Sequence, residues 1–175
     1  MILITGSTGY IGSHLACYFE KNNIDFIGID NLSYSYKTNV LKKRNHFFID
    51  ISNIDKVSQI IKKYKPTTVI HTAAFSYVIE AENKKKKYYN NNIIKTKKFI
   101  DICKNLKIKN FLFLSSSNVY QENNYNISFN EKSSNKPKNH YGKNKLAIEK
   151  YLKKKFNNLI ILRLFNVIGV FNKNF

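Results

Sequence analysis

Gly6-Ser7-Thr8-Gly9-Tyr10-Ile11-Gly12 is the stretch that decides the fold. It follows the apolar run 1–5 and opens a segment, 9–19, whose apolar residues recur at helical spacing. In such a strand–turn–helix unit the first glycine permits the sharp turn, the second lets the backbone approach a pyrophosphate, and the third lets helix and strand pack closely. The amides and dipole of the helix N-terminus favour an anion there. The stretch therefore predicts a turn that holds the pyrophosphate of a dinucleotide.

The second apolar run, 25–30, ends in an acid that sharpens this prediction. Three glycines alone are weak support, because turns collect glycine for conformational reasons. Asp30, however, lies near the ~20-residue offset expected of a ribose-binding acid. Its carboxylate would accept hydrogen bonds from ribose hydroxyls and repel a 2′-phosphate, which favours NAD over NADP. Asp50 and Ile51 either hold the edge and face of the adenine, or Asp50 caps the next helix; the two alternatives weigh about equally.

Strand-like and helix-like segments alternate along the whole chain. This alternation predicts an α/β fold, a doubly wound parallel sheet of the NAD(P)-binding Rossmann type, in one domain over residues 1–175. We expect Ser52 to cap the helix at 54–64, the lysines at 84–87 to begin a helix in solvent, and the Asn- and Ser-rich stretch 122–139 to be a mobile loop. The expected strands are 1–5, 25–30, 46–49, 68–71, 110–114 and 159–164, and further helices are expected at 88–105 and 141–155.

The net charge of +19 raises the question of a nucleic-acid or anionic-membrane partner. Nearly all of it is lysine, with only Arg44 and Arg163 as arginines, and it accompanies abundant Asn, Ile, Tyr and Phe. All five abundant residue types have A/T-rich codons, so a biased genome would produce this composition on any fold. Lysine is also less suited than arginine to bidentate recognition of phosphate or bases. We therefore favour a solvated lysine surface and expect no nucleic-acid partner.

The remaining composition favours a cytoplasmic protein. No apolar run approaches the roughly 18 residues needed to cross a bilayer, so we expect no membrane association. Residues 1–5 lack the basic leader of a signal peptide, and we take Met1 as the true start. The two widely spaced cysteines, Cys17 and Cys103, predict neither a disulfide framework nor a metal site. We expect both to be free thiols in a reducing compartment.

Tyr141 and Lys145 form the candidate catalytic pair. At a spacing of i and i+4 both side chains emerge on one face of a helix. The Lys145 ammonium and the positive charge of a bound nicotinamide would lower the pKa of Tyr141, which could then act as a general base. An isolated Tyr-x-x-x-Lys is easily an ordinary exposed pair, but here Ser116 ends a strand at its carboxyl edge, where ligands bind in open α/β sheets. Ser116 is placed to hydrogen-bond a substrate hydroxyl.

Together these segments resemble the extended short-chain dehydrogenase/reductase family, and within it the nucleotide-sugar epimerases similar to UDP-glucose 4-epimerase. The resemblance spans essentially the whole chain. It is carried by eight segments in order: 5–14, 30–32, 50–51, 71–74, 88–92, 115–120, 141–145 and 163–166.

The resemblance implies a transient oxidation at the sugar C4 hydroxyl. Tyr141 would take the hydroxyl proton while hydride passes to NAD, with help from Ser116 and Lys145, and the rotated ketose would be reduced from its other face. The implied catalytic residues are Ser116, Tyr141 and Lys145. The implied cofactor contacts are Gly6, Gly9, Tyr10, Ile11, Gly12, Asp30, Asn31, Asp50, Ile51, Thr72, Ala73, Asn92, Tyr141, Lys145 and Phe165. The implied contacts to the nucleotide-diphosphate sugar are Ser116, Tyr141 and Asn166.

Several alternatives stay open. Related dehydratases carry an acid beside the active Ser or Thr, where this chain has Ser117 and Asn118, and a reductase is also compatible with the motifs. Tyr34, Ser76 and Gln121 depart from the residues usual in hexose 4-epimerases. Family members continue past 163–166 into a substrate-binding lobe that we expect to be largely absent here, so a non-catalytic NAD-binding module is the further alternative. A homodimer also remains open.

Overall fold

The computed structural model describes residues 1–39, 46–120 and 128–169, and in this part of the chain six parallel strands form one sheet. The strand order is β3-β2-β1-β4-β5-β6, which confirms the predicted doubly wound arrangement. Each strand coincides with one of the predicted apolar runs to within a few residues. The strands are β1 (Ile2–Thr5), β2 (Phe26–Asp30), β3 (His46–Phe48), β4 (Thr68–His71), β5 (Asn110–Ser116) and β6 (Asn158–Leu164).

The direction of the strand order reverses between β1 and β4, so this is the switch point of the sheet. Thr5 and His71, the last residues of these two strands, are direct partners in the register. Crossovers leave the two strands in opposite directions, and a crevice therefore opens beyond their carboxyl ends. Ligands of open α/β sheets bind in such a crevice.

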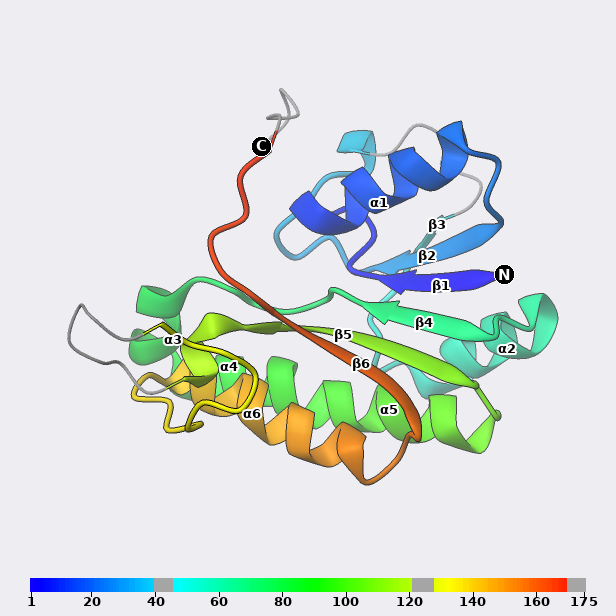
Figure 1. The fold of residues 1–175 in the computed structure, drawn as a ribbon. Coiled ribbons are helices and arrows are strands. Elements are labelled where there is room, and N and C mark those ends of the chain that lie inside the picture. Colours follow the sequence, from blue (N-terminus) through cyan, green and yellow to red (C-terminus); the bar gives the residue numbers. More distant parts are fainter. Residues whose placement is uncertain (40–45, 121–127, 170–175) are drawn as a thin grey trace.

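Helices cover both faces of the sheet (Figure 1). Helix α1 (Tyr10–Lys21) lies on one face over β1 and β2, and α2 (Ile54–Tyr64), α5 (Thr96–Asn105) and α6 (His140–Lys153) lie on the other. The larger core fills the second face, with Leu3, Val69, Phe99, Phe111 and Ile148 almost without exposure. A smaller cluster under α1 contains Ile4, Ala16, Phe19, Phe26 and Ile70. Burial on both faces explains why the strands read as unbroken apolar runs.

Helix α2 begins where the sequence predicted, but its cap is a different residue. The Asn53 side chain accepts from the Lys56 N–H and forms the N-cap, whereas Ser52 donates both its backbone N–H and its hydroxyl to Asp50. The predicted Ser52 cap is therefore wrong. Both residue types cap helices well, and the nearby carboxylate of Asp50 draws Ser52 into the preceding turn instead.

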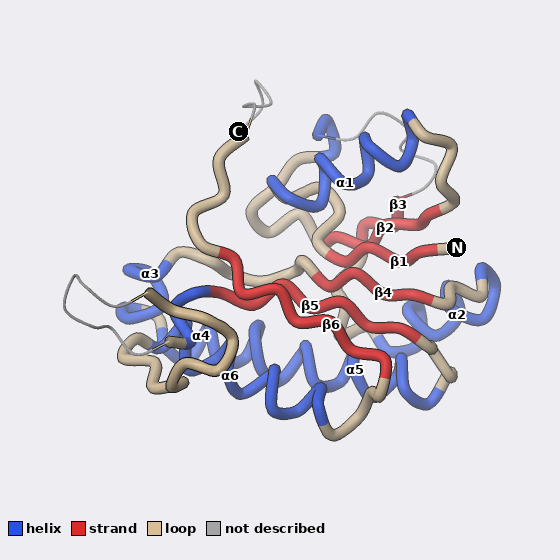
Figure 2. Tube along the Cα trace, viewed as in Figure 1, coloured by secondary structure: helices blue, strands red, loops and turns tan. Residues whose placement is uncertain are grey.

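The single helix predicted at 88–105 is divided into three parts, all of which Figure 2 draws as helix. Helix α4 (Lys85–Tyr89) leads into a π-helical turn, η3 (Asn90–Lys95), and then into α5. The short α3 (Val78–Asn83), which the sequence analysis did not predict, precedes them. A π turn carries an extra residue per turn and redirects the side chains within it, and such turns are frequent at functional sites.

The lysines at 84–87 are exposed and lead into α4, as predicted. Of the predicted loop 122–139, residues 128–139 contain no helix or strand, and the part up to 127 lies outside the described residues. Over the described ranges, no helix is long and apolar enough to span a bilayer. Cys17 and Cys103 are both free thiols, as expected.

Candidate cofactor and active site

The glycine turn after β1 has the conformation that its sequence predicts. Gly6 lies in the left-handed region at φ +70°, and a Cβ there would come within 2.7 Å of the Ala73 amide nitrogen. A Cβ on Gly12 would overlap the Gly6 carbonyl oxygen, so α1 packs directly on the turn. The cap residue Gly9 offers no side chain to the helix end, and the first turn of α1 carries no acid. The positive end of the helix dipole is therefore left for an anion such as a pyrophosphate.

A cavity of about 510 Å³ lies beside this turn, at the carboxyl ends of the strands. Every predicted site residue lines it except Asp50 and Asn92. One end holds Gly6, Gly9, Tyr10, Ile11, Gly12, Asp30, Asn31 and Ile51, the middle holds Thr72 and Ala73, and the other end holds Ser116, Tyr141, Lys145, Phe165 and Asn166. The structure thus brings together segments that are more than a hundred residues apart in sequence.

Asp30 connects the glycine turn to the loop after β2. Its carboxylate accepts from the Thr8 N–H at 3.1 Å, the Leu32 N–H at 2.8 Å and the Ser35 hydroxyl at 3.1 Å. A carboxylate has about four acceptor positions, so one remains for a further donor. Only 7% of Asp30 is exposed, and it lines the cavity. This position fits a ribose hydroxyl.

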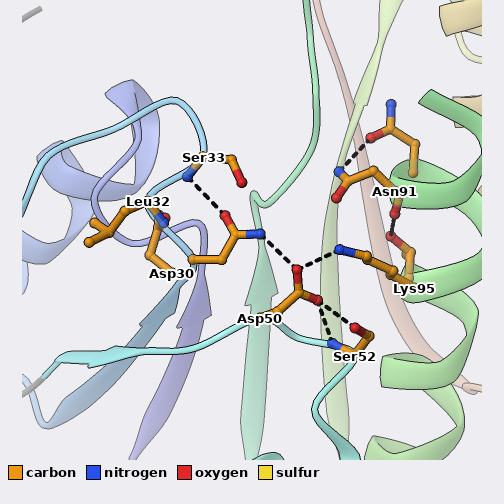
Figure 3. A network of polar contacts seen from close by, with 10 residues as sticks. Asp30, Leu32, Ser33, Asp50, Ser52, Asn91 and Lys95 are labelled. Atoms are coloured by element: carbon orange, nitrogen blue, oxygen red, sulfur yellow. Dashed lines mark hydrogen bonds and ion pairs between the residues drawn. The ribbon is translucent and has the colours of Figure 1, made fainter. Parts of the chain in front are cut away.

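Asp50 lies in a network of polar contacts between the loop after β2 and η3 (Figure 3). Its carboxylate accepts from Lys95 Nζ at 2.6 Å, Asn31 Nδ2 at 2.8 Å, and the backbone and hydroxyl of Ser52 at 2.9 and 2.6 Å. Burial raises the pKa of Asp50, but these hydrogen bonds, led by that of Lys95, outweigh it and hold the pKa well below its usual range. The four contacts use its acceptor capacity. Asp50 therefore ties the loop after β2 to η3. It is not among the residues that line the cavity, and Asn53 rather than Asp50 caps α2.

Asn92 also lies outside the cavity, which corrects its predicted place in the lining. Its amide accepts from the Phe75 N–H and donates to the Phe75 carbonyl, both at 2.9 Å. Asn92 thereby fixes the loop after β4, whose residues 72–77 form one wall of the cavity. Its neighbour Asn91 lines the cavity instead. The π turn explains the exchange, because the extra residue rotates the side chains relative to an α-helix.

The start of α6 places Tyr141 beside Ser116. The Asn139 side chain accepts from the Gly142 N–H at 2.7 Å and caps the helix. A Cβ on Gly142 would overlap the Asn118 carbonyl oxygen, so the helix packs tightly on the 3₁₀ turn η4 (Ser117–Val119). Ser116 is the residue just before that turn, and its hydroxyl lies near enough to the Tyr141 phenol to lower the pKa of that group. The close approach at Gly142 thus sets the distance between the two hydroxyls.

Lys145 is 5% exposed, and burial lowers its pKa to about 8. Its ammonium donates to the Leu114 carbonyl at 2.6 Å and lies 4.8 Å from the centre of the Phe113 ring. The centre of the Tyr141 ring is 5.7 Å away. At neutral pH most of Lys145 is therefore charged next to the phenol.

Tyr141 itself differs from the prediction of a lowered pKa. Burial raises the pKa of its phenol to about 12, and the nearby Ser116 hydroxyl offsets only part of this effect. In the protein alone, desolvation of the phenolate outweighs the neighbouring lysine. The lowering that we expected therefore depends on further positive charge at this end of the cavity.

Asn118 belongs to the same end of the cavity, and no contact of this residue was predicted from the sequence. Its backbone and side-chain N–H groups donate to the Ser116 hydroxyl oxygen at 3.2 and 3.1 Å, and Asn139 donates to its side-chain oxygen at 2.6 Å. The sequence signal that could have identified Asn118 was its position two residues after Ser116, in a turn that follows a strand. Among the described residues that line the cavity Asp30 is the only acid, so no carboxylate lies beside Ser116.

Comparison with known proteins places this geometry in a family. A putative UDP-glucose 4-epimerase of Methanocaldococcus jannaschii is 33% identical over 97% of this chain and 56% of its own. A dTDP-D-glucose 4,6-dehydratase of Dictyostelium discoideum is 35% identical over 96% of this chain and 44% of its own. The solved UDP-glucose 4-epimerase of Brucella ovis in complex with NAD superposes with a TM-score of 0.88 at 31% identity, over 94% of this chain and 51% of that one.

The chain thus spans about half the length of the relatives that it matches. The family model described as "NAD dependent epimerase/dehydratase family" matches residues 2–175. This match includes the glycine turn, Ser116, Tyr141 and Lys145, and it confirms the resemblance seen in the sequence. The chain belongs to the NAD dependent epimerase/dehydratase family.

Proposed function

We propose that this protein binds NAD in the cavity and acts as, or within, a nucleotide-sugar epimerase that oxidises and re-reduces the C4 hydroxyl of a UDP-glucose or UDP-galactose type substrate. One observation carries the proposal: a single cavity joins a glycine turn with an uncapped helix N-terminus to Ser116, Tyr141 and Lys145. The solved relative that contains NAD supports this cofactor.

The residues divide the binding between them. The turn at 6–12 holds the pyrophosphate, and Asp30 accepts from the adenosine ribose and disfavours a 2′-phosphate. Ile51, which lines the cavity, packs on the adenine, and Phe165 packs behind the nicotinamide. Asn166 contacts the substrate diphosphate, a role that its place in the lining supports.

NAD, when bound, supplies the acceptor for a hydride and returns it to the substrate. Tyr141 takes the proton of the sugar hydroxyl and later gives it back, and the Ser116 hydroxyl holds that oxygen in place. The Lys145 ammonium stabilises the phenolate form of Tyr141. The phenol is almost completely buried, so that bulk water does not compete for its proton.

A 4,6-dehydratase is the second candidate, and the relative from Dictyostelium discoideum favours it. Elimination of water needs an acid and a base beside the sugar in addition to the tyrosine. Among the described residues that line the cavity, Asn118 lies near Ser116 and no carboxylate does. This lining favours epimerisation over elimination. A non-catalytic NAD-binding module is the third candidate.

Three measurements on the purified chain separate these candidates. NAD affinity is measured by calorimetry, conversion of UDP-galactose to UDP-glucose by chromatography, and formation of a 4-keto-6-deoxy sugar from dTDP-glucose by its alkaline absorbance. Epimerisation is the outcome that would support the proposal, and Tyr141→Phe should bind NAD without turnover. Binding without either product would support the module, and absence of NAD binding would overturn the proposal.

Location and assembly belong to the same proposal. We propose a cytoplasmic protein, since Cys17 and Cys103 are both free thiols, as suits a reducing compartment. We also propose a homodimer as the assembled form, with sedimentation velocity as the test. A single monomeric species at micromolar concentration would contradict it.

A further inference from the structure

Glu149 is a buried carboxylate that the proposed reaction does not yet use. It lies one helical turn after Lys145 on α6 and is 1% exposed. Arg163 Nε and Nη2, from β6, donate to its two oxygens at 3.0 and 2.7 Å, and the Ser115 hydroxyl, from β5, donates at 2.5 Å. Burial of a carboxylate is costly unless it is paired and hydrogen-bonded. These contacts hold the Glu149 carboxylate in one position.

Lys145 needs a negative charge nearby to stay protonated. Its direct contacts are the Leu114 carbonyl, an uncharged acceptor, and the face of the Phe113 ring. Loss of water lowers the pKa of Lys145 to about 8, and the charge of Glu149 opposes that decrease. Without this opposing charge, an ammonium so deeply buried would release its proton nearer neutral pH.

The other described charges on the surrounding elements do not replace Glu149. His71, from β4, is buried, and its burial together with the charge of Lys145 lowers its pKa to about 3, so it is neutral at pH 7. Asp101, from α5, forms an ion pair with Lys155. Glu80, from α3, pairs with lysines of its own region. Arg163, from β6, is positive and is itself bound by Glu149.

We propose that Glu149 is a positioning residue which, clamped by Arg163 and Ser115, keeps Lys145 protonated beside Tyr141. The charged lysine then favours the phenolate that accepts the sugar proton. The consequence of this inference for catalysis rests on the function proposed above. The effect of Glu149 on the protonation of Lys145 does not depend on that function.

Replacement of Glu149 by Gln distinguishes an electrostatic role from a merely structural one, because the two roles predict changes of opposite sign in the pKa of Lys145. Loss of the charge alone should lower the pKa of Lys145 by about one pH unit. If the substitution only loosened the packing, water would reach Lys145 and its pKa would rise toward the ordinary 10.5. A fall from about 8 to about 7 reduces the protonated share at pH 7 from about nine tenths to about one half.

The pKa of Lys145 can be measured in the full chain without substrate, by competitive acetylation across a pH series with mass spectrometry. Asp101→Asn is the matched control, because it removes a carboxylate that pairs with Lys155, just after α6, and accepts a hydrogen bond from Tyr151 of α6. It should leave the pKa of Lys145 unchanged. If Glu149→Gln does not fold, as circular dichroism would show, the double variant with Arg163→Met avoids an unpaired buried charge. Because it also removes a positive charge, its decrease in the pKa of Lys145 should be smaller than that of Glu149→Gln, and a rise would overturn the inference.

An unchanged or raised pKa of Lys145 in the folded variant would overturn the inference. If the chain turns over substrate, Glu149→Gln should move the alkaline fall of kcat to lower pH by the same amount and leave KM for the sugar nucleotide nearly unaltered. If no variant turns over substrate, the proposed function fails while the labelling still decides the role of Glu149.

Discussion

At the scale of single residues, Tyr141 illustrates how strongly burial controls the chemistry. Burial is the main reason why the pKa of its phenol is raised to about 12 and the pKa of the Lys145 ammonium is lowered to about 8. Desolvation destabilises each charged form, so the two groups reach their reactive states only together: phenolate beside ammonium.

With bound NAD supplying the positive charge that lowers the pKa of Tyr141 below that of Lys145, we expect turnover to rise with pH while Tyr141 loses its proton and to fall again near pH 8, as Lys145 loses its own. Tyr141→Phe should lower kcat by about 10²–10⁴-fold, the usual contribution of a general base. Its NAD affinity should remain close to that of the unaltered chain. A pH–rate series from pH 6 to 10 gives both results, and a rate that keeps rising above pH 9 would contradict the role of Lys145.

Asp50 gives a stability prediction at the same scale. Its pKa is lower in the folded protein than in the unfolded chain, so its contribution is full above the unfolded value near 4 and is lost as pH falls through the folded value. Asp50→Asn should reduce the free energy of unfolding by about 2 kcal/mol at pH 7, the usual worth of hydrogen bonds to a charged group.

Denaturation by urea at pH 7 and at pH 2.5 checks this expectation, because the difference between the two proteins should shrink at the lower pH. Asp25→Asn, at an exposed acid outside the network, is the control and should change little. Equal differences at both pH values would show that charge is not the reason for the loss.

At the scale of elements, the packing at the start of α6 positions Tyr141 at the proposed catalytic end of the cavity. Helix propensity alone predicts that Gly142→Ala stabilises the protein by about 1 kcal/mol. Because a Cβ there would overlap the Asn118 carbonyl oxygen, we expect the opposite sign, with lower stability and reduced turnover. Thermal unfolding and the epimerase assay measure both effects. Ala147→Gly, an exposed position of the same helix, isolates propensity and should cost about 1 kcal/mol without loss of activity.

Elements also show what the sequence could and could not predict. Strands such as 68–71 and 110–114 were recognisable because burial on both faces leaves an unbroken apolar run. The π turn at Asn90–Lys95 was not, because its contacts reach Phe75 and Asp50, far away in sequence. For the same reason the network around Asp50 was not predicted, because its partners include residues 19 and 45 positions away.

At the scale of the whole molecule, the net charge of +19 could be mistaken for a sign of a nucleic-acid partner. A solvated lysine surface should bind duplex DNA weakly and without sequence preference, through counterion release. We expect binding at about 20 mM salt that is lost by about 200 mM, measured by fluorescence anisotropy with two unrelated duplexes. Tight binding at 150 mM salt that distinguishes the duplexes would instead indicate a nucleic-acid partner.

Cofactor binding should be visible in the stability of the whole chain, because a ligand that binds only the folded state raises the free energy of unfolding. NAD at one hundred times its dissociation constant should add about 2.7 kcal/mol. NADP should add much less at the same concentration, since Asp30 lies where its 2′-phosphate would be placed. Thermal unfolding with each dinucleotide measures the difference, and AMP is a control for binding through the adenosine alone. Equal stabilisation by NAD and NADP would show that Asp30 does not contact the ribose, and would reassign this acid to the support of the loop that its bonds to Thr8, Leu32 and Ser35 already hold.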